Sequence, residues 1–249
     1  MEIKRKKYQG VLNILSFNRH FYVFGLLALF ALVASYFLFH WSFLLFSLVI
    51  VLFLFGLIMP LLVSAYVYDF SGFYDFAWLK EMNLDDSADQ FNLNINAGFD
   101  ETSFIIKNIL PQSTLQVYDF YNAKQHTEPA IVRARKVSMI YPNSQQIVSN
   151  HIPLPDASVD HVFLISAIHE IRSNEEKVQF LKECRRVCKA NGNVIMVEHL
   201  RDLPNFFAFT IGFTHFFSKA TWKRAFIDAG FKSINETKFT PFMSIFNCK

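Results

Sequence analysis

The sequence has little of what marks several classes of protein. Its 249 residues include only three cysteines, eight glycines and eight prolines. So few cysteines exclude a disulfide-stapled scaffold, and so little glycine and proline excludes a collagenous or low-complexity chain. Charged residues make up 18%, against roughly 25% in a typical soluble protein, whereas 52% of residues are hydrophobic and 30 are phenylalanine. This apolar composition also excludes a disordered chain.

Positive charge is concentrated at the amino terminus. Positions 1–19 hold five basic residues and one acidic residue, and the rest of the chain is close to neutral. A nucleic-acid-binding domain carries a clustered basic face, so we expect no nucleic-acid partner. We interpret 1–19 as a basic arm that precedes the rest of the protein.

A long stretch that begins at position 20 contains no Asp, Glu, Lys or Arg. It covers 20–68, which is 49 residues. A helix crosses the hydrocarbon core of a bilayer in about 20 residues, so this stretch predicts two spans, at 21–39 and 43–63, joined by a short turn. The apolar region of a signal peptide has only about 7–15 residues, so a signal peptide does not explain this one. We therefore expect a two-helix transmembrane hairpin and a bilayer as a partner.

The basic arm predicts how the hairpin is oriented. Basic residues stay on the cytoplasmic side, and an even number of spans returns the chain to that side. The expected protein is an integral membrane protein, of the bacterial inner membrane if the source is prokaryotic, with both termini in the cytoplasm. Its cysteines are then reduced thiols, and Cys184 and Cys188, four residues apart on an expected helix, are assigned to core packing.

After a polar and aromatic connection at 69–90, strand and helix patterns alternate through the domain 91–249. Strands are expected at 91–95, 115–119, 146–149, 162–168, 194–197, 232–239 and 242–247, and helices at 100–110, 129–137, 173–191 and 218–229. Such alternation predicts an α/β fold with a doubly wound, Rossmann-like sheet. Ligands then bind beyond the carboxyl ends of the strands.

For one helix of this domain, the sequence contains signals for both the start and the end. Ser173 and Glu176 form an S-x-x-E capping box, and apolar residues follow at helical spacing. Gly192 is expected to end the helix, because glycine adopts the left-handed conformation common at helix ends. A strand begins soon afterwards.

Three motifs of the domain carry a family resemblance. Residues 152–160, IPLPDASVD, resemble the L-P-F-x-D-x-S-F-D segment of class I S-adenosylmethionine-dependent methyltransferases. Residues 183–192, ECRRVCKANG, are similar to their E-x-x-R-V-L-K-P-G-G, and 228–231 match their D-A-G-F. The resemblance is to the type 11 subgroup that includes the quinone-biosynthesis methyltransferases, and it covers 90–249 in the right order.

The resemblance implies S-adenosylmethionine as the cofactor and points to the residues that bind it. The family's first strand leads into D/E-x-G-x-G-x-G, whereas this chain has NINAGFD at 94–100, a degenerate motif that keeps only its central glycine. Asp119 matches the acid after the second strand that binds the ribose hydroxyls. The implied cofactor-binding residues are Asn94, Asn96, Gly98 and Asp119.

Polar groups follow two neighbouring strands where the family binds the methyl acceptor. His169 or His199 is the predicted base for the acceptor proton, with Glu170 or Glu198 orienting it. An Arg–carboxylate network that braces the strand ends is the alternative. We expect no metal, because no metal-ligand spacing such as H-E-x-x-H occurs, and the absence of G-x-S-x-G argues against a hydrolase. Candidate substrate-binding residues are His126, Arg172, Arg201, Asp202, Asn205 and His215.

The segment 204–217 holds six phenylalanines and no charge. It is too short to span a bilayer, so it is buried, interfacial, or a lid over the acceptor pocket. Together these features predict a membrane-anchored methyltransferase that acts on a lipophilic small molecule, quinone-, isoprenoid- or lipid-like. The alternative is a catalytically inactive methyltransferase fold that serves as a membrane-bound interaction subunit.

Overall fold

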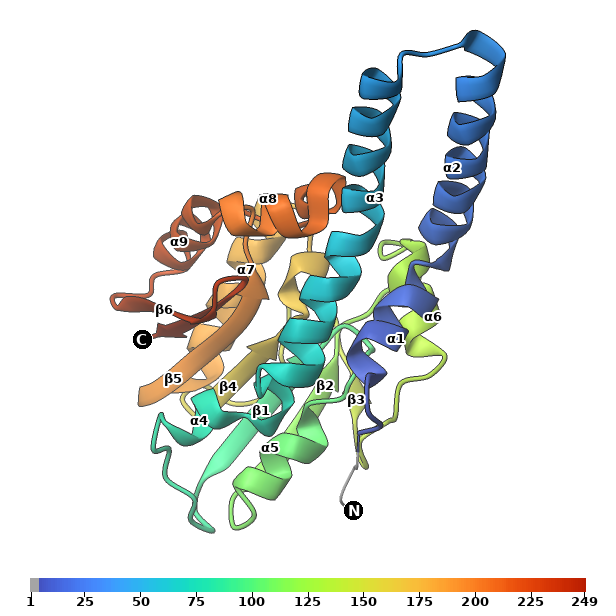
Figure 1. Ribbon diagram of the computed structural model, residues 1–249. Coiled ribbons are helices and arrows are strands. Elements are labelled where there is room, and N and C mark those ends of the chain that lie inside the picture. The colour runs from blue at the N-terminus through green and yellow to red at the C-terminus, as the bar shows by residue number, and fades with distance from the viewer. Residues whose placement is uncertain (1–4) are drawn as a thin grey trace.

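The computed structural model describes residues 5–249, so Lys4 of the basic arm lies outside the described residues. The domain contains one seven-stranded sheet with the spatial order β3-β2-β1-β4-β5-β7-β6 (Figure 1). Its strands are β1 (Phe91–Asn96), β2 (Thr114–Asp119), β3 (Gln145–Gln146), β4 (Val159–Ile165), β5 (Cys188–His199), β6 (Ile234–Thr240) and β7 (Met243–Cys248). The third strand is shorter than predicted.

The sheet is parallel from β3 to β5, whereas β7 runs antiparallel to both β5 and β6. The strand order reverses at β1, which lies between β2 and β4. Open α/β sheets bind ligands beyond the carboxyl ends of the strands at such a reversal. The predicted α/β fold is therefore confirmed, and the region beyond β1 and β4 is where a site is expected.

Helices cover both faces of the sheet. On one face, Phe180 and Trp222 belong to a core formed with alternate residues of β4 and β5, and on the other face Ile106 packs with Phe163 and Ile195. Every residue of β4 is buried, which explains its almost continuous apolar sequence. The domain's helices are α5 (Ser103–Ile109), α6 (Pro129–Arg135), α7 (Asn174–Val187), α8 (Leu203–Phe209) and α9 (Lys219–Asp228), with 3₁₀ turns η3 (Ile168–Glu170) and η4 (Thr210–His215).

The segment 69–90 is more than the polar and aromatic connection expected from the sequence. It begins within a helical turn, η1 (Tyr66–Phe70), and contains a 3₁₀ turn, η2 (Phe73–Asp75), and the short helix α4 (Ala77–Lys80). Phe73, Phe76, Trp78 and Leu79 are buried in the core on one face of the sheet. These elements are too short to show a helical period, so the sequence pattern did not reveal that they pack on the sheet.

The amino-terminal arm also packs on the domain. It forms helix α1 (Gln9–Phe17), and the Asp69 carboxylate accepts hydrogen bonds from the first backbone N–H groups of α1, at 2.7 Å from Gly10 and 3.0 Å from Val11. At the other end of α1, Arg133 of α6 donates to the carbonyl oxygen of Phe17. Hydrogen bonds therefore hold both ends of α1 on the domain.

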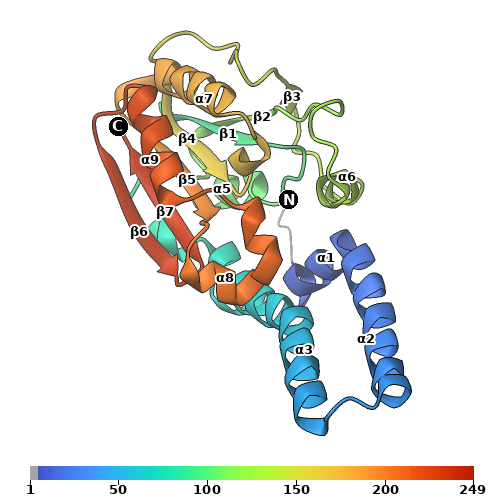
Figure 2. The ribbon, with the colours of Figure 1, turned by 90° about the horizontal axis from the view of Figure 1, so that it is seen from above.

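Two long helices project from the domain as a hairpin, α2 (Arg19–Phe39) and α3 (Phe43–Ala65) (Figures 1 and 2). Both are long and apolar enough to cross a membrane, and their most apolar windows are 0% and 6% buried. A core helix of that composition would be mostly buried, so these helices leave a large apolar surface uncovered. The last turn of α3 enters the domain, where Val63 and Ser64 are buried.

The boundary between α7 and β5 differs from the prediction. The Ser173 hydroxyl caps α7 by accepting from the Glu176 N–H, as expected. The helix ends at Val187, however, and Gly192 lies inside β5. A Cβ at Gly192 would lie 2.3 Å from the carbonyl oxygen of Asp160, so the glycine allows two strands to approach closely. The prediction that Gly192 ends the helix was wrong.

Candidate functional site

The carboxyl ends of β1 and β2 lie side by side, and Asn96 pairs with Asp119 in the sheet register. The following loop turns at Gly98, whose φ of +85° is a left-handed conformation that glycine adopts readily. The Asn96 side-chain oxygen accepts a hydrogen bond from the Gly98 N–H at 2.7 Å and stabilises the turn. The structure thus brings together three of the four predicted cofactor-binding residues.

The guanidinium of Arg135, at the end of α6, lies between the glycine turn and Asp119, and we call this place the cofactor cleft. It donates to the Asp119 carboxylate at 2.7 Å and lies over the Tyr121 ring, 4.0 Å from the centroid. A Cβ built on Gly98 would lie 1.4 Å from the Arg135 Nη1 atom, so the guanidinium packs directly on the glycine. Arg135 therefore fills the space between the glycine turn and the acid at the end of β2.

Asn94 and Asp100 lie behind the turn. Asn94 is buried in β1 and donates to the hydroxyls of Ser103 and Thr102 at 2.7 and 3.1 Å. Asp100 accepts from the backbone N–H groups of Thr102 and Ser103 at the start of α5, and burial raises its pKa in spite of these bonds. Within the described chain, one oxygen of each side chain, Asn94 Oδ1 and Asp100 Oδ2, has no partner.

These residues fit S-adenosylmethionine. The Asp119 side chain is 19% exposed, so its carboxylate is within reach of ribose hydroxyls, and Gly98 lets a ligand approach the backbone. The unpartnered oxygens of Asn94 and Asp100 suit an ammonium group. Arg135 has to turn away for the cofactor to enter, and because its side chain is flexible and 31% exposed, the cleft can open without refolding.

A cavity of about 200 Å³ adjoins the same loop. Ala97 and Phe99 line it on the side of the loop, and Ser166 lines it beyond β4. The opposite wall comes from α1, with Ile14 and Phe17, and from η1 and η2. Most of the lining is apolar, but one end, the polar end of the pocket, consists of Glu128, His169, Glu170 and His215.

His169 is held between two carboxylates. Its Nδ1 atom lies 2.8 Å from Glu198, whose side chain is 1% exposed, and its Nε2 atom lies 3.5 Å from Glu170. Burial alone would lower the pKa of His169, but the charges and hydrogen bonds of Glu198 and Glu170 outweigh it and raise the pKa to about 10. Burial would likewise raise the pKa of Glu170, but His169 lowers it. His169 is therefore a charged imidazolium at neutral pH in this structure.

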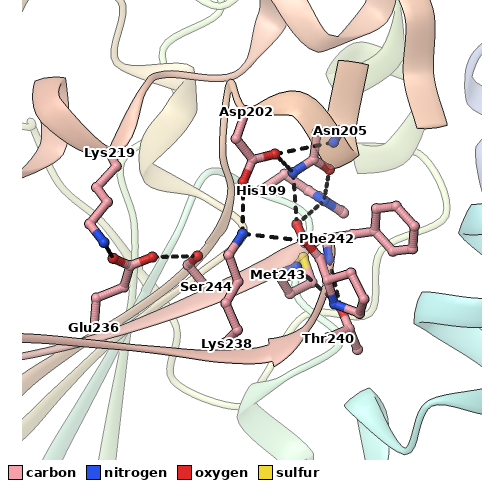
Figure 3. Close-up of polar contacts among 11 residues, drawn as sticks. His199, Asp202, Asn205, Lys219, Glu236, Lys238, Thr240, Phe242, Met243 and Ser244 are labelled. Carbon is pink, nitrogen blue, oxygen red and sulfur yellow. Dashed lines mark hydrogen bonds and ion pairs between the residues drawn. The ribbon is translucent and has the colours of Figure 1, made fainter. Parts of the chain in front are cut away.

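His199 lies outside the pocket lining, in the polar network of Figure 3. Its Nδ1 atom is 2.9 Å from the carbonyl oxygen of Phe242, and its Nε2 atom is 2.8 Å from the Tyr68 hydroxyl. Burial lowers the pKa of His199 to about 4, although its hydrogen bonds with Asn205 and Phe242 act in the opposite direction. A neutral imidazole that donates to the carbonyl and accepts from Tyr68 explains both contacts. The structure thus gives His199 a bracing position, whereas His169 lines the pocket.

Several predicted substrate-binding residues also hold loops together. Arg172 donates to the carbonyl oxygens of His169 and His215, and Arg201 donates to that of Phe216 at 2.8 Å. Asp202 caps α8 and pairs with Lys238, as Figure 3 shows. These contacts brace the loops, but they run from arginine to backbone carbonyl oxygens and from Lys238 to Asp202, and not between arginine and carboxylate as the alternative predicted. Of the predicted catalytic and substrate-binding residues, those outside the pocket lining are His126, Glu198, His199, Arg172, Arg201, Asp202 and Asn205.

Three important parts of the site had no individual role in the sequence prediction, although Glu128 and Arg135 belong to a polar cluster after the second strand that was expected near the acceptor site. Glu128 lines the pocket, and its carboxylate lies 3.3 Å from the His215 Nδ1 atom. Arg135 fills the cofactor cleft, and Tyr68 joins the pocket wall to His199. Glu128 and Arg135 lie in the polar stretch after β2, which was the only sequence signal for them. Tyr68 is the last residue of the charge-free stretch 20–68, and no sequence pattern distinguished it from the rest of that stretch.

Comparison with known proteins agrees with this geometry. Residues 116–196 match the family model described as a methyltransferase domain, from within β2 to within β5, which leaves the glycine turn outside the match. No curated protein matches the chain.

The fold is similar to that of several solved structures. A SAM-dependent methyltransferase from Aquifex aeolicus is 16% identical with a TM-score of 0.50, and the alignment covers 72% of this chain and 92% of that one. A protein from Pyrococcus horikoshii OT3 is 16% identical with a TM-score of 0.51, over 73% and 91% of the two chains. A candidate O-methyltransferase from Nostoc punctiforme is 16% identical with a TM-score of 0.51, over 76% of this chain and 61% of that one, which is less than two thirds of its length. The chain thus has the fold of SAM-dependent methyltransferases, and the family match supports that activity and S-adenosylmethionine as the cofactor.

Proposed function

We propose that this chain is a membrane-anchored methyltransferase that transfers the methyl group of S-adenosylmethionine to a lipophilic small molecule, quinone-, isoprenoid- or lipid-like, at the cytoplasmic face of the membrane. The observation that carries the proposal is the position of the pocket. Its walls are built from the elements that join both apolar helices to the domain.

The pocket lies at the base of the hairpin. Phe17 and Asn18, which line it, immediately precede α2, and Tyr68, which also lines it, follows α3. If α2 and α3 span the bilayer, the pocket is next to the inner leaflet. A lipophilic acceptor then reaches the pocket without passing through bulk water, which supports this class of substrate.

The phenylalanine-rich segment adds a second apolar surface at the same end of the molecule. Helix α8 packs beside α3 in both views (Figures 1 and 2). Leu203, Phe207 and Ile211 of α8 and η4 are 72%, 58% and 85% exposed, although they carry no charge. Such a surface is typical of an interfacial helix. His215, at the end of η4, reaches the pocket, so this segment combines the predicted interfacial and lid roles.

Methyl transfer requires an aligned acceptor and an exit for its proton. When bound, S-adenosylmethionine would supply a methyl group carried on its sulfonium, and the pocket residues would align the acceptor atom with it. His169 faces the pocket, with Glu198 holding its ring in place. With a pKa of about 10, its imidazolium stabilises the anion of an acceptor that ionises, such as a phenol, whose pKa is also about 10. Only above its pKa of about 10 is His169 neutral and able to accept the acceptor proton, so at neutral pH its role in the proposal is electrostatic.

The inactive interaction subunit is the second candidate, and a specific observation favours it. The Arg135–Asp119 ion pair fills the cleft, and the glycine motif is reduced to Gly98. In a protein that never binds the cofactor, this pair would be a permanent part of the fold. Binding of the cofactor product therefore separates the two candidates.

Two measurements on the full chain in detergent or nanodiscs test the proposal. Calorimetry with S-adenosylhomocysteine should show one binding site per chain. Incubation with methyl-labelled S-adenosylmethionine and membranes of the source cell should place label in the organic extract, and His169→Asn should lower it, whereas His151→Asn, at an exposed histidine, should not. Absence of S-adenosylhomocysteine binding would favour the interaction subunit, and label only in the aqueous phase would overturn the lipophilic acceptor.

A further inference from the structure

The polar end of the pocket brings together side chains that are distant in the sequence. One ligand atom from each of His169, Glu170 and His215 lies within 4.8 Å of the others. We propose that this end binds one divalent transition-metal ion through these three residues. The proposed methyltransferase needs no metal, so the site goes beyond that function.

The geometry is close to that of a three-ligand site. The His169 Nε2 atom is 3.5 Å from the Glu170 carboxylate, and the rings of His169 and His215 meet edge to face with centroids 5.0 Å apart. The Glu128 carboxylate lies 3.3 Å from the His215 Nδ1 atom and contacts that ring, but it is not one of the three ligands. Small side-chain movements would bring these atoms within coordination distance of one ion.

Glu198 orients His169 as a second carboxylate does in known metal sites. Its carboxylate accepts from the His169 Nδ1 atom at 2.8 Å and from the backbone N–H groups of Ala167 and His169. Because Nδ1 is occupied, Nε2 is the nitrogen that faces Glu170 and the pocket. Metal-binding histidines almost always donate their other ring N–H to a carboxylate, a carbonyl or water, and this contact orients the ring.

The carboxylates at and next to the polar end also favour binding of a cation. Two carboxylates, those of Glu128 and Glu170, belong to the polar end, and that of Glu198 lies next to it on the other side of the His169 ring; all three contact histidine. The nearby guanidinium of Arg172 donates to the carbonyl oxygens of His169 and His215 instead of to these carboxylates. Two imidazoles with carboxylates favour ions such as Zn²⁺ or Mn²⁺ over Mg²⁺, which prefers oxygen ligands alone.

A bound ion has a clear chemical use in this pocket. Three protein ligands leave a coordination position open, and an acceptor oxygen that binds there becomes easier to deprotonate. This use rests on the proposed function, whereas the binding of the ion does not. The ion and a proton compete for the same His169 nitrogen, so the metal-bound and protonated forms are alternative states of one site.

Calorimetry of the full chain in detergent tests the site. The protein is treated with a chelator, dialysed and titrated with ZnCl₂ and, separately, MnCl₂. We expect one saturable site in the parent for at least one of the two ions, and a loss of affinity of about 10–100-fold in Glu198→Gln, which keeps the size of the side chain and an acceptor oxygen but removes the negative charge beside His169. His215→Ala should lose affinity as well. His151→Ala is the control, because His151 also lies near a carboxylate, 3.7 Å from Glu183, but far more exposed.

The outcomes separate this proposal from the proposed function. No saturable binding of either ion in the parent overturns the site, and so does unchanged affinity in Glu198→Gln when thermal unfolding shows that the variant is folded. S-adenosylhomocysteine binding is measured on the same chelator-treated samples. Cofactor binding without metal binding refutes only the metal site, and metal binding without cofactor binding refutes only the methyltransferase.

Discussion

Replacing Asp119 by Ala removes the carboxylate at the centre of the proposed cofactor cleft. In the structure, one Asp119 oxygen accepts from the Tyr121 N–H at 2.7 Å, and the other accepts from Arg135 at 2.7 Å. In the proposed complex the carboxylate instead accepts from two ribose hydroxyls, after Arg135 has moved away. The substitution therefore removes both the contacts with the cofactor and the contact with its competitor.

The expected loss of affinity follows from these contacts. Hydrogen bonds to a charged group contribute about 1.5–3 kcal/mol each, so two ribose hydroxyls contribute about 3–6 kcal/mol. Displacing Arg135 costs the parent about 0.2–1 kcal/mol, because the ion pair is partly exposed. The net loss is at least about 2 kcal/mol, which exceeds a tenfold change in affinity, since about 1.4 kcal/mol corresponds to tenfold.

The assay is calorimetry with S-adenosylhomocysteine on the full chain, with thermal unfolding as the check on folding. Asp119→Asn is the matched variant, because it retains an oxygen for the Tyr121 N–H and loses only the charge. Arg135→Gln should bind at least as tightly as the parent, because it removes the side chain that fills the cleft. Equal affinity in Asp119→Ala and the parent would refute the assignment, and weaker binding in Arg135→Gln would show that Arg135 contacts the cofactor.

Three further predictions concern the histidines and the hairpin. His169→Asn should lower methyl transfer by about 10²–10⁴-fold with cofactor affinity intact. His199→Asn should lower the free energy of unfolding by about 1–3 kcal/mol and retain activity per folded molecule. The reverse result would assign the catalytic role to His199. The thermal midpoint should peak near pH 6.5. Below pH 6.5 the unfolded chain protonates His199, whereas the folded chain keeps it neutral because its pKa is about 4, so stability falls toward acid pH. Above pH 6.5 the unfolded chain loses the His169 proton, whereas the folded chain holds it to about pH 10, so stability falls toward alkaline pH. His199→Asn should flatten the acid side of the curve, and His169→Asn the alkaline side. A reporter fused after Lys80 should be cytoplasmic, and export would reject the predicted orientation.

The parts of the fold that follow from local patterns could be predicted from the sequence. The charge-free stretch 20–68 marked both long helices, and β1, β2, β6, β7 and α9 lie close to their predicted positions. Hydrophobic periodicity and caps depend on neighbouring residues, so these elements are visible in the sequence. The packing of α1 and of 69–90 on the domain depends on distant partners such as Asp69 and Glu101, and no local pattern reveals such contacts.

The sequence predicted which region of the fold holds the site, but not how its side chains are arranged. The sequence by itself determined that polar residues follow the central strands, because strand ends are local features. Only the tertiary structure decided which of them meet: His215 joins His169 from 46 residues away, and Arg135 turns onto Asp119.

Glu198 and His199 show the physical reason most clearly. They are adjacent in β5, and successive side chains of a strand point to opposite faces of the sheet. Glu198 therefore contacts His169 on one face of the sheet, while His199 contacts Tyr68 and Phe242 on the other face. Their order is visible in the sequence, but the partners that each face meets are decided only when the strands and helices pack.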